Sequence, residues 1–183
     1  MTELKPSSTT ETALVDRPTL RFMLAHPLHV IALGFGSGLS PYAPGTFGTL
    51  FAWASFRALD IALPADVFLL LILLAFVLGI VAIEKTGTAL DEIDHGGIVW
   101  DEIVPFWGVL WLLAQVMGDN LAWQGIAFAL FRFFDIKKPW PASYYDRQVK
   151  NGYGVMMDDV IAAVYTVLSL AVFLVFVYLN VHQ

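Results

Sequence analysis

The sequence predicts an all-α fold: a polytopic membrane helical bundle of about four to five transmembrane or re-entrant helices. Hydrophobic residues make up 58% of the 183 residues and charged residues only 14%, and the mean hydropathy is +0.70. These values are typical of an integral membrane protein. The apolar segment 160–181 contains no charged residue and has the length of about 20 residues that spans a bilayer core.

The amino-terminal residues 1–21 are polar and contain no apolar run, so they do not form a secretory signal. We interpret them as a mobile cytoplasmic tail, followed by a single integral-membrane domain over 22–183. Arg17 and Arg21 precede the first apolar segment, and positive charges before a span favour the cytoplasmic side.

A segment rich in glycine and proline, GFGSGLSPYAPGTFGT at 34–49, interrupts the first apolar region. Such a segment cannot continue a lipid-facing helix, because its free backbone groups need protein or water partners. It is therefore expected to lie at the membrane surface or to re-enter from it. It lacks the pattern of a nucleotide-binding P-loop. Its backbone N–H groups could bind an anion, together with Ser37, Thr46 and Thr49, or the segment could be only a tight connection.

Five apolar segments beyond this region predict helices, of which the first and the fourth are short for a complete span. Pro105 is expected to interrupt the third helix. The predicted helices cover 46–61, 65–83, 98–117, 121–134 and 160–181.

The basic residues test this topology. With a cytoplasmic tail, the loops 84–97 and 135–157 face the cytoplasm, and all ten Lys and Arg residues except Arg57 fall on that side. This agrees with the positive-inside rule. The glycine-rich segment and both charged loops then share one membrane face.

Acidic residues precede two of the apolar segments. Asp101 and Glu102 lie at a predicted membrane boundary, where carboxylates usually face a partner or a water-filled cavity. The alternative is that they only stabilise the first turn of a helix. Asp158 and Asp159 open the last predicted helix, and one of them could serve as an N-cap.

Asp135 follows the fourth predicted helix, at the end where the helix dipole disfavours an anion. It therefore needs a nearby cation, which Arg132 or Lys138 could supply. Helix electrostatics alone do not explain an acid at this position.

Acids and bases gathered at one membrane face predict a site for a lipid phosphate ester. Carboxylate oxygens suit Mg²⁺, which often also binds substrate phosphate, and Arg and Lys neutralise phosphoryl oxygens. The candidate catalytic residues are Asp101, Glu102, Asp135, Asp158 and Asp159. The candidate metal ligands are Asp94, Asp101, Glu102, Asp135 and Asp159. The candidate substrate-binding residues are Arg132, Lys138, Ser37, Gly45, Thr46 and Thr49.

Two other functions use the same residues. A small ion-coupled transporter would place charges at several depths and would often contain repeated halves, and the sequence has neither feature. A non-catalytic subunit could bind anionic lipid through its basic residues, and its acids would then tolerate substitution. No cysteine is present, which excludes cysteine phosphatases and cysteine metal sites.

Four segments together resemble bacterial phosphatidylglycerophosphatase A, in the same order and over roughly two thirds of the chain. They are GFGSGLSPYAPGTFGTL at 34–50, DHGGIVWDEIV at 94–104, FRFFDIKKPWP at 131–141 and YDRQVKNGYGVMMDDV at 145–160.

The resemblance implies Mg²⁺-dependent hydrolysis of phosphatidylglycerophosphate to phosphatidylglycerol and inorganic phosphate, in glycerophospholipid biosynthesis. It also implies a multi-pass protein of the bacterial inner membrane with its active site on the cytoplasmic face. Two positions depart from the family pattern, because Pro105 and Asn151 stand where the family has glycine. Attack by water and formation of an aspartyl phosphate both remain open as mechanisms, and the sequence does not fix the oligomeric state.

Overall fold

The computed structural model describes residues 17–181, which form helices and loops without a β-strand. The predicted all-α fold is confirmed. Most of the predicted tail over 1–21 lies outside the described residues, and its last two residues, Leu20 and Arg21, belong to the first described helix. The elements in order are α2 (Leu20–Leu24), α3 (Pro27–Ala32), the 3-10 helix η1 (Gly34–Leu39), α4 (Pro44–Ala62), α5 (Ala65–Ala89), α6 (Trp100–Met117), α7 (Leu121–Lys137), α8 (Ala142–Gln148) and α9 (Gly152–Val181).

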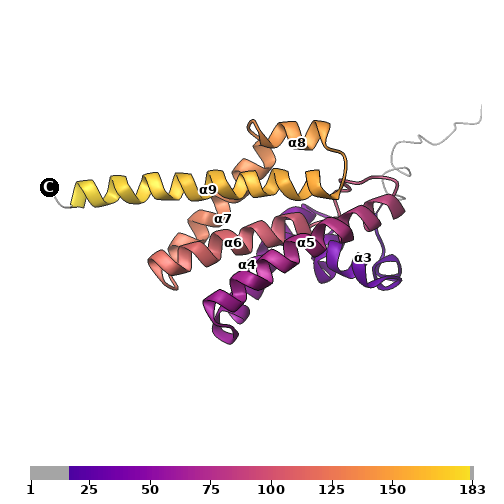
Figure 1. Cartoon of the computed structure of the whole chain (residues 1–183), viewed down its shortest axis with the longest axis horizontal. Helices are drawn as coiled ribbons and strands as arrows, with labels where there is room; N and C mark the ends of the chain where they lie inside the picture. Colours follow the sequence, from indigo (N-terminus) through magenta and orange to yellow (C-terminus); the bar gives the residue numbers. More distant parts are fainter. Residues whose placement is uncertain (1–16, 182–183) are drawn as a thin grey trace, which may run out of the picture.

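The long helices alternate in direction through the bundle (Figure 1). Short turns join α4 to α5 and α6 to α7, and short connections of this kind make consecutive helices antiparallel. The start of α4 lies against α6 and α7, and the start of α9 lies against the second half of α5. The loops 90–99 and 138–151 therefore lie at the same end of the bundle, which we call the polar end.

Several helix boundaries differ from the prediction. α5 continues past Ile83 to Ala89, and α7 extends to Lys137. The glycine-rich segment is not one loop, because it contains η1 and the first turns of α4. The short helix α8 was not predicted. Pro105 does not interrupt α6, which continues from Trp100 to Met117, so that expectation was wrong.

The last helix begins at Gly152, well before the predicted start, because two other residues satisfy its first N–H groups. The side chain of Asn151 accepts a hydrogen bond from the Gly154 N–H at 2.9 Å, and the Glu84 carboxylate of α5 accepts one from the Gly152 N–H at 2.6 Å. Unpaired N–H groups at a helix start need such partners. Asp158 and Asp159 consequently lie inside the helix, and the interpretation of either residue as its N-cap was wrong.

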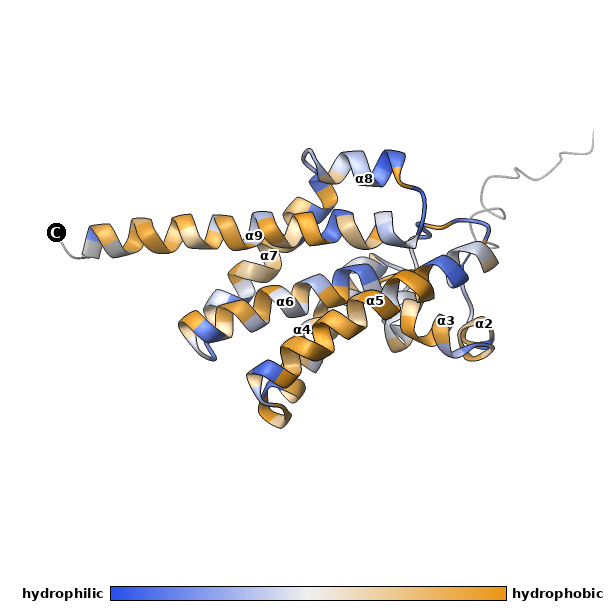
Figure 2. Ribbon diagram, viewed as in Figure 1, coloured by the Kyte–Doolittle hydropathy of each residue, from blue (hydrophilic) through white to orange (hydrophobic). Residues whose placement is uncertain are grey.

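Among the described residues, two helices are long and apolar enough to cross a membrane, α5 and α9 up to Val177. Only 33% of the most apolar part of α5 and 17% of that of α9 are buried. Most of their apolar side chains therefore face outward, unlike those of a core helix in a soluble protein. Hydrophobic residues predominate along both helices (Figure 2). The chain is accordingly an all-α membrane protein, and the expected total of four to five spans stays a prediction.

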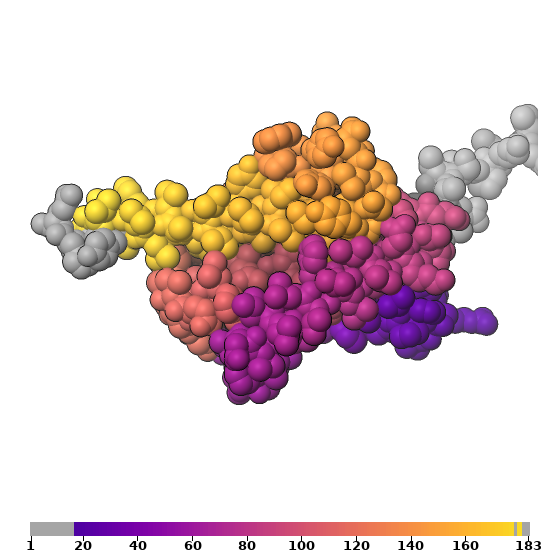
Figure 3. All heavy atoms as spheres, in the orientation of Figure 1, coloured from indigo at the N-terminus to yellow at the C-terminus, as the bar shows by residue number. Residues whose placement is uncertain are grey.

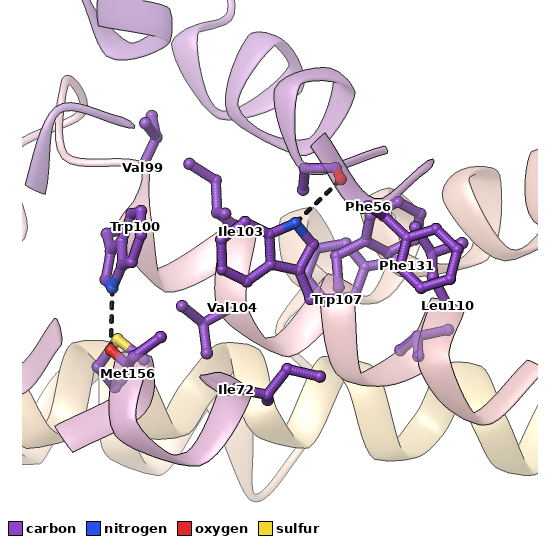
Figure 4. Packing of buried hydrophobic residues seen from close by; sticks show 14 of the residues in the cluster. Phe56, Ile72, Val99, Trp100, Ile103, Val104, Trp107, Leu110, Phe131 and Met156 are labelled. Carbon is purple, nitrogen blue, oxygen red and sulfur yellow. Dashed lines mark hydrogen bonds between the residues drawn. The ribbon is translucent and has the colours of Figure 1, made fainter. Parts of the chain in front are cut away.

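Helix α6 lies at the centre of the bundle and contacts α4, α5, α7 and α9. Its side chains Ile103 and Phe106 are fully buried. Two indole N–H groups attach it to its neighbours: Trp107 donates to the Ala52 carbonyl and Trp100 to the Ala75 carbonyl, each at 3.0 Å (Figure 4). This packing fixes the position of the acids in the first turn of α6.

Arg57, the basic residue that the topology places on the outer side, is paired at the opposite end of the bundle. Its guanidinium donates two hydrogen bonds to Asp119, at 2.6 and 3.0 Å. These bonds lower the pKa of Asp119 below its ordinary value. The side chain of Gln124, which is 1% exposed, donates to the Asp119 carboxylate at 3.0 Å and accepts from the Trp53 indole at 2.6 Å. A polar network therefore joins α4 to α7.

Replacing Gln124 by leucine is expected to lower the free energy of unfolding by about 1–3 kcal/mol, because the Trp53 N–H would lose its acceptor inside a helix interface. Unfolding of the purified protein in detergent, followed by circular dichroism, measures the change. The variant Arg57→Gln is a control from the same network. Its effect should be clearly smaller, as for other solvent-exposed ion pairs. Equal losses in the two variants would contradict this interpretation.

Candidate functional site

Three carboxylates from two helices meet at the polar end of the bundle. Asp101 and Glu102 come from the first turn of α6 and Asp159 from α9, and each is at most 8% exposed. One oxygen from each carboxylate lies within 4.8 Å of the other two. We call this group the three-acid cluster.

Two oxygens of the three-acid cluster have no hydrogen-bond partner, Oδ1 of Asp101 and Oε2 of Glu102. Buried carboxylates without a partner are costly unless a cation compensates them. Carboxylate oxygens are hard ligands of the kind that Mg²⁺ prefers. The cluster therefore has the composition and the unpaired atoms that suit a divalent cation.

Arg132 of α7 forms a second part of the site. Its guanidinium forms an ion pair with Asp135, one turn later in the same helix, and lies 3.6 Å from the Glu102 carboxylate. The Nη1 atom also donates to the Thr49 hydroxyl at 3.5 Å. Of the two bases expected near Asp135, Arg132 is the one that contacts it. The Nε atom of Arg132 is buried without a partner.

Lys138, at the end of α7, contacts three other parts of the polar end. Its ammonium donates to Asp158 of α9 at 2.5 Å and to Asp146 of α8 at 2.6 Å, and it lies 4.0 Å from Asp94. Burial by itself would lower the pKa of Lys138, but these carboxylates outweigh it and the pKa lies above its ordinary value. Lys138 therefore stays charged and holds the loop 90–99, α8 and α9 together.

Asp94 lies in the loop before α6, half-buried. Burial raises the pKa of its carboxyl, while the charge of Lys138 opposes that rise. Of the five expected metal ligands, the structure thus brings Asp101, Glu102 and Asp159 together, whereas Asp94 faces Lys138 and Asp135 faces Arg132.

The start of α4 approaches the acids closely at Gly45. A Cβ atom at this position would lie 2.1 Å from Oε1 of Glu102 and 3.1 Å from the terminal nitrogens of Arg132, so no larger residue fits without movement. The Thr49 hydroxyl donates to the Gly45 carbonyl at 2.8 Å. Thr46 is half-buried in the same part of α4. Ser37 donates to the Gly34 carbonyl at 2.8 Å, a local bond within η1.

Sequence reasoning did not identify Asp146 as a partner of Lys138 or Glu84 as a partner of the start of α9. Asp146 lies in the highly charged region 131–159, so its charge was visible there, but its helix α8 was not predicted. The contact of Glu84 with Gly152 had no signal in the sequence, because it joins two distant helix ends.

The sequence matches known proteins over most of its length. The sequence model of the family Phosphatidylglycerophosphatase A matches residues 30–174. The chain is 45% identical over 155 residues to phosphatidylglycerophosphatase A of Haemophilus influenzae, covering 84% of this chain and 92% of that protein. It is 39% identical over 144 residues to phosphatidylglycerophosphatase A of Escherichia coli, covering 79% of this chain and 81% of that protein.

A further relative, from Bacteroides thetaiotaomicron, is named provisionally as a phosphatidylinositol-3-phosphatase. It is 44% identical over 149 residues, covering 78% of this chain and 91% of that protein. No solved structure matches the chain.

Proposed function

The chain belongs to the phosphatidylglycerophosphatase A family and is a phosphatase, and from this premise we propose that it hydrolyses phosphatidylglycerophosphate to phosphatidylglycerol and inorganic phosphate. The reaction would serve glycerophospholipid biosynthesis, in the bacterial inner membrane with the site on the cytoplasmic face. The observation that carries the proposal is the three-acid cluster beside Arg132 at one end of a membrane bundle. This arrangement suits a charged headgroup on an apolar lipid.

We propose Mg²⁺ as the cofactor, held by Asp101, Glu102 and Asp159. The unpartnered oxygens of Asp101 and Glu102 support this assignment, as does the preference of Mg²⁺ for carboxylate and phosphate oxygens. When bound, the ion would polarise a phosphoryl oxygen as a Lewis acid. The other proposed contributions, binding and orienting the phosphoryl group, come from side chains of the protein.

Arg132 is proposed to bind the phosphoryl oxygens, since its planar guanidinium matches their geometry. Asp135 and the Thr49 hydroxyl orient it from two sides. Gly45 allows the start of α4 to approach Glu102 and Arg132 closely, because a Cβ atom there would collide with the Glu102 carboxylate. Lys138 acts as a positioning residue, because it holds Asp158 next to Asp159.

The assay that tests the proposal measures inorganic phosphate released by the purified protein in detergent from phosphatidylglycerophosphate. Phosphatidylinositol 3-phosphate is the comparison substrate, because one relative carries that name. Faster release from the phosphoinositide would contradict the proposed substrate. Uptake of solute into liposomes without phosphate release would favour the alternative function, a small ion-coupled transporter.

Removal of divalent cations is expected to reduce the phosphatase rate, and added Mg²⁺ should restore it, because the three-acid cluster would otherwise keep unpaired buried carboxylates. The measurement is the rate after treatment with a chelator and after titration with Mg²⁺. Ca²⁺ is the matched control for charge, since it differs from Mg²⁺ in size and coordination. A rate that persists in chelator would overturn the metal assignment.

A further inference from the structure

An apolar groove lies between α5, α6 and α9, and no charged residue lines it. Its volume is about 480 Å³, and each residue that lines it is apolar or glycine. A volume of this size lies within the range of about 300–1,000 Å³ that is usual for small-molecule sites. Figure 3 shows this face of the molecule, where α9 lies beside α6 and α5 and the surface is recessed between them.

The groove lies close to the three-acid cluster along α6 and α9. On α6, the lining residues Val104, Pro105 and Gly108 follow Asp101 by three, four and seven positions, so they share its helix face. On α9, the lining residue Ala163 follows Asp159 by four positions. On both helices the lining of the groove therefore starts within about one turn of an acid of the three-acid cluster.

Gly108 keeps the groove open. A Cβ atom at this position would meet no atom within 4 Å, so no close packing requires a glycine here. Glycine in a helix interior is less favourable than alanine by about 1 kcal/mol. Its presence in the middle of α6 is explained if the space beside it must stay free.

The groove also opens sideways. Leu73, Val164 and Leu168 line it and are 57%, 52% and 55% exposed. In a membrane these side chains would face the lipid, so a hydrocarbon chain could enter from the bilayer without crossing the polar end. With the proposed Mg²⁺ on the three-acid cluster and with Arg132 beside Glu102, this arrangement suits a ligand that is apolar along its length and anionic at one end.

We propose that this groove binds one acyl chain of the lipid phosphate substrate and thereby directs the phosphate to the three-acid cluster. The proposal rests on the proposed function and adds the residues that recognise the lipid. A helix of a partner protein is the alternative occupant. It would not account for the position of the groove about one turn from the acids on α6 and α9, whereas a lipid phosphate does.

Two substitutions fill the groove from different helices, Gly108→Leu and Val164→Trp. The matched control is Val172→Trp on α9, where the native side chain is 71% exposed and lies outside the groove. Each protein is assayed on a long-chain lipid phosphate in mixed micelles and on a short-chain, water-soluble analogue with the same headgroup. The mass of each detergent-solubilised protein is measured in parallel.

Both groove variants are expected to lower kcat/KM for the long-chain substrate by about tenfold or more, which corresponds to lost burial of roughly two CH₂ groups. Their kcat/KM for the short-chain analogue should stay within about twofold of wild type, and Val172→Trp should resemble wild type on both substrates.

Several results would overturn the proposal. Equal losses on both substrates would mean that the variants damage the acids, and no loss on the long-chain substrate would mean that the chain binds elsewhere. A changed mass in the groove variants would indicate that a second copy occupies the groove. A wild-type protein that hydrolyses neither substrate would overturn the proposed function, and the groove assignment with it.

Discussion

Replacing Asp101 by asparagine is expected to reduce kcat for lipid phosphate by about 10²–10³-fold, the scale of losing one electrostatic contact in a buried site. Asparagine keeps the size of the side chain and removes the charge. The lost charge belongs to a buried carboxylate with an unpartnered oxygen. The measurement is the rate of phosphate release at saturating Mg²⁺, and Asp66→Asn at the exposed start of α5 is the control.

The Tm of Asp101→Asn should not fall together with kcat. Removing one of several crowded, uncompensated carboxylates relieves repulsion, so without metal the Tm of Asp101→Asn should equal or exceed that of wild type. Added Mg²⁺ should raise the Tm of wild type, because a ligand that binds only the folded state stabilises it. The variant should show a smaller rise. An active variant, or an inactive one with a lowered Tm, would contradict the proposed role of Asp101.

The sequence predicted the long helices well, because a membrane bundle needs long apolar segments and they are visible in one dimension. It placed the start of α9 too late at 160, since the residues before it are polar and charged. The helix is extended by Asn151 and by Glu84 of a distant helix. The contact with Glu84 joins two distant helix ends, so the composition of the segment before 160 cannot reveal it.

The sequence also predicted that acids and bases gather at one end, because the positive-inside pattern and the alternating helices require it. It could not assign the partners. Arg132 and Lys138 both lie three positions from Asp135, so spacing along the chain allows either pair, and the structure pairs Asp135 with Arg132. The contacts of Lys138 with Asp158 and of Asp159 with the α6 acids join different helices and depend on how those helices pack.

Replacing Arg132 by glutamine is expected to lower both activity and stability. The change leaves Asp135 and Glu102 buried without their cation, and breaking a buried ion pair from one side lowers the free energy of unfolding by about 3–5 kcal/mol. If Arg132 also binds the phosphoryl group, kcat/KM should fall by about 10²–10³-fold. Unfolding in detergent and phosphate release measure the two effects separately.

The double variant Arg132→Gln with Asp135→Asn separates the two roles of Arg132. It removes both charges of the ion pair, so most of the lost stability should return, because no carboxylate at position 135 then lacks its cation. The activity should stay low, since the substrate still lacks its guanidinium. Recovery of activity together with stability would mean that Arg132 only neutralises Asp135. Phosphate binding would then fall to other groups at the polar end.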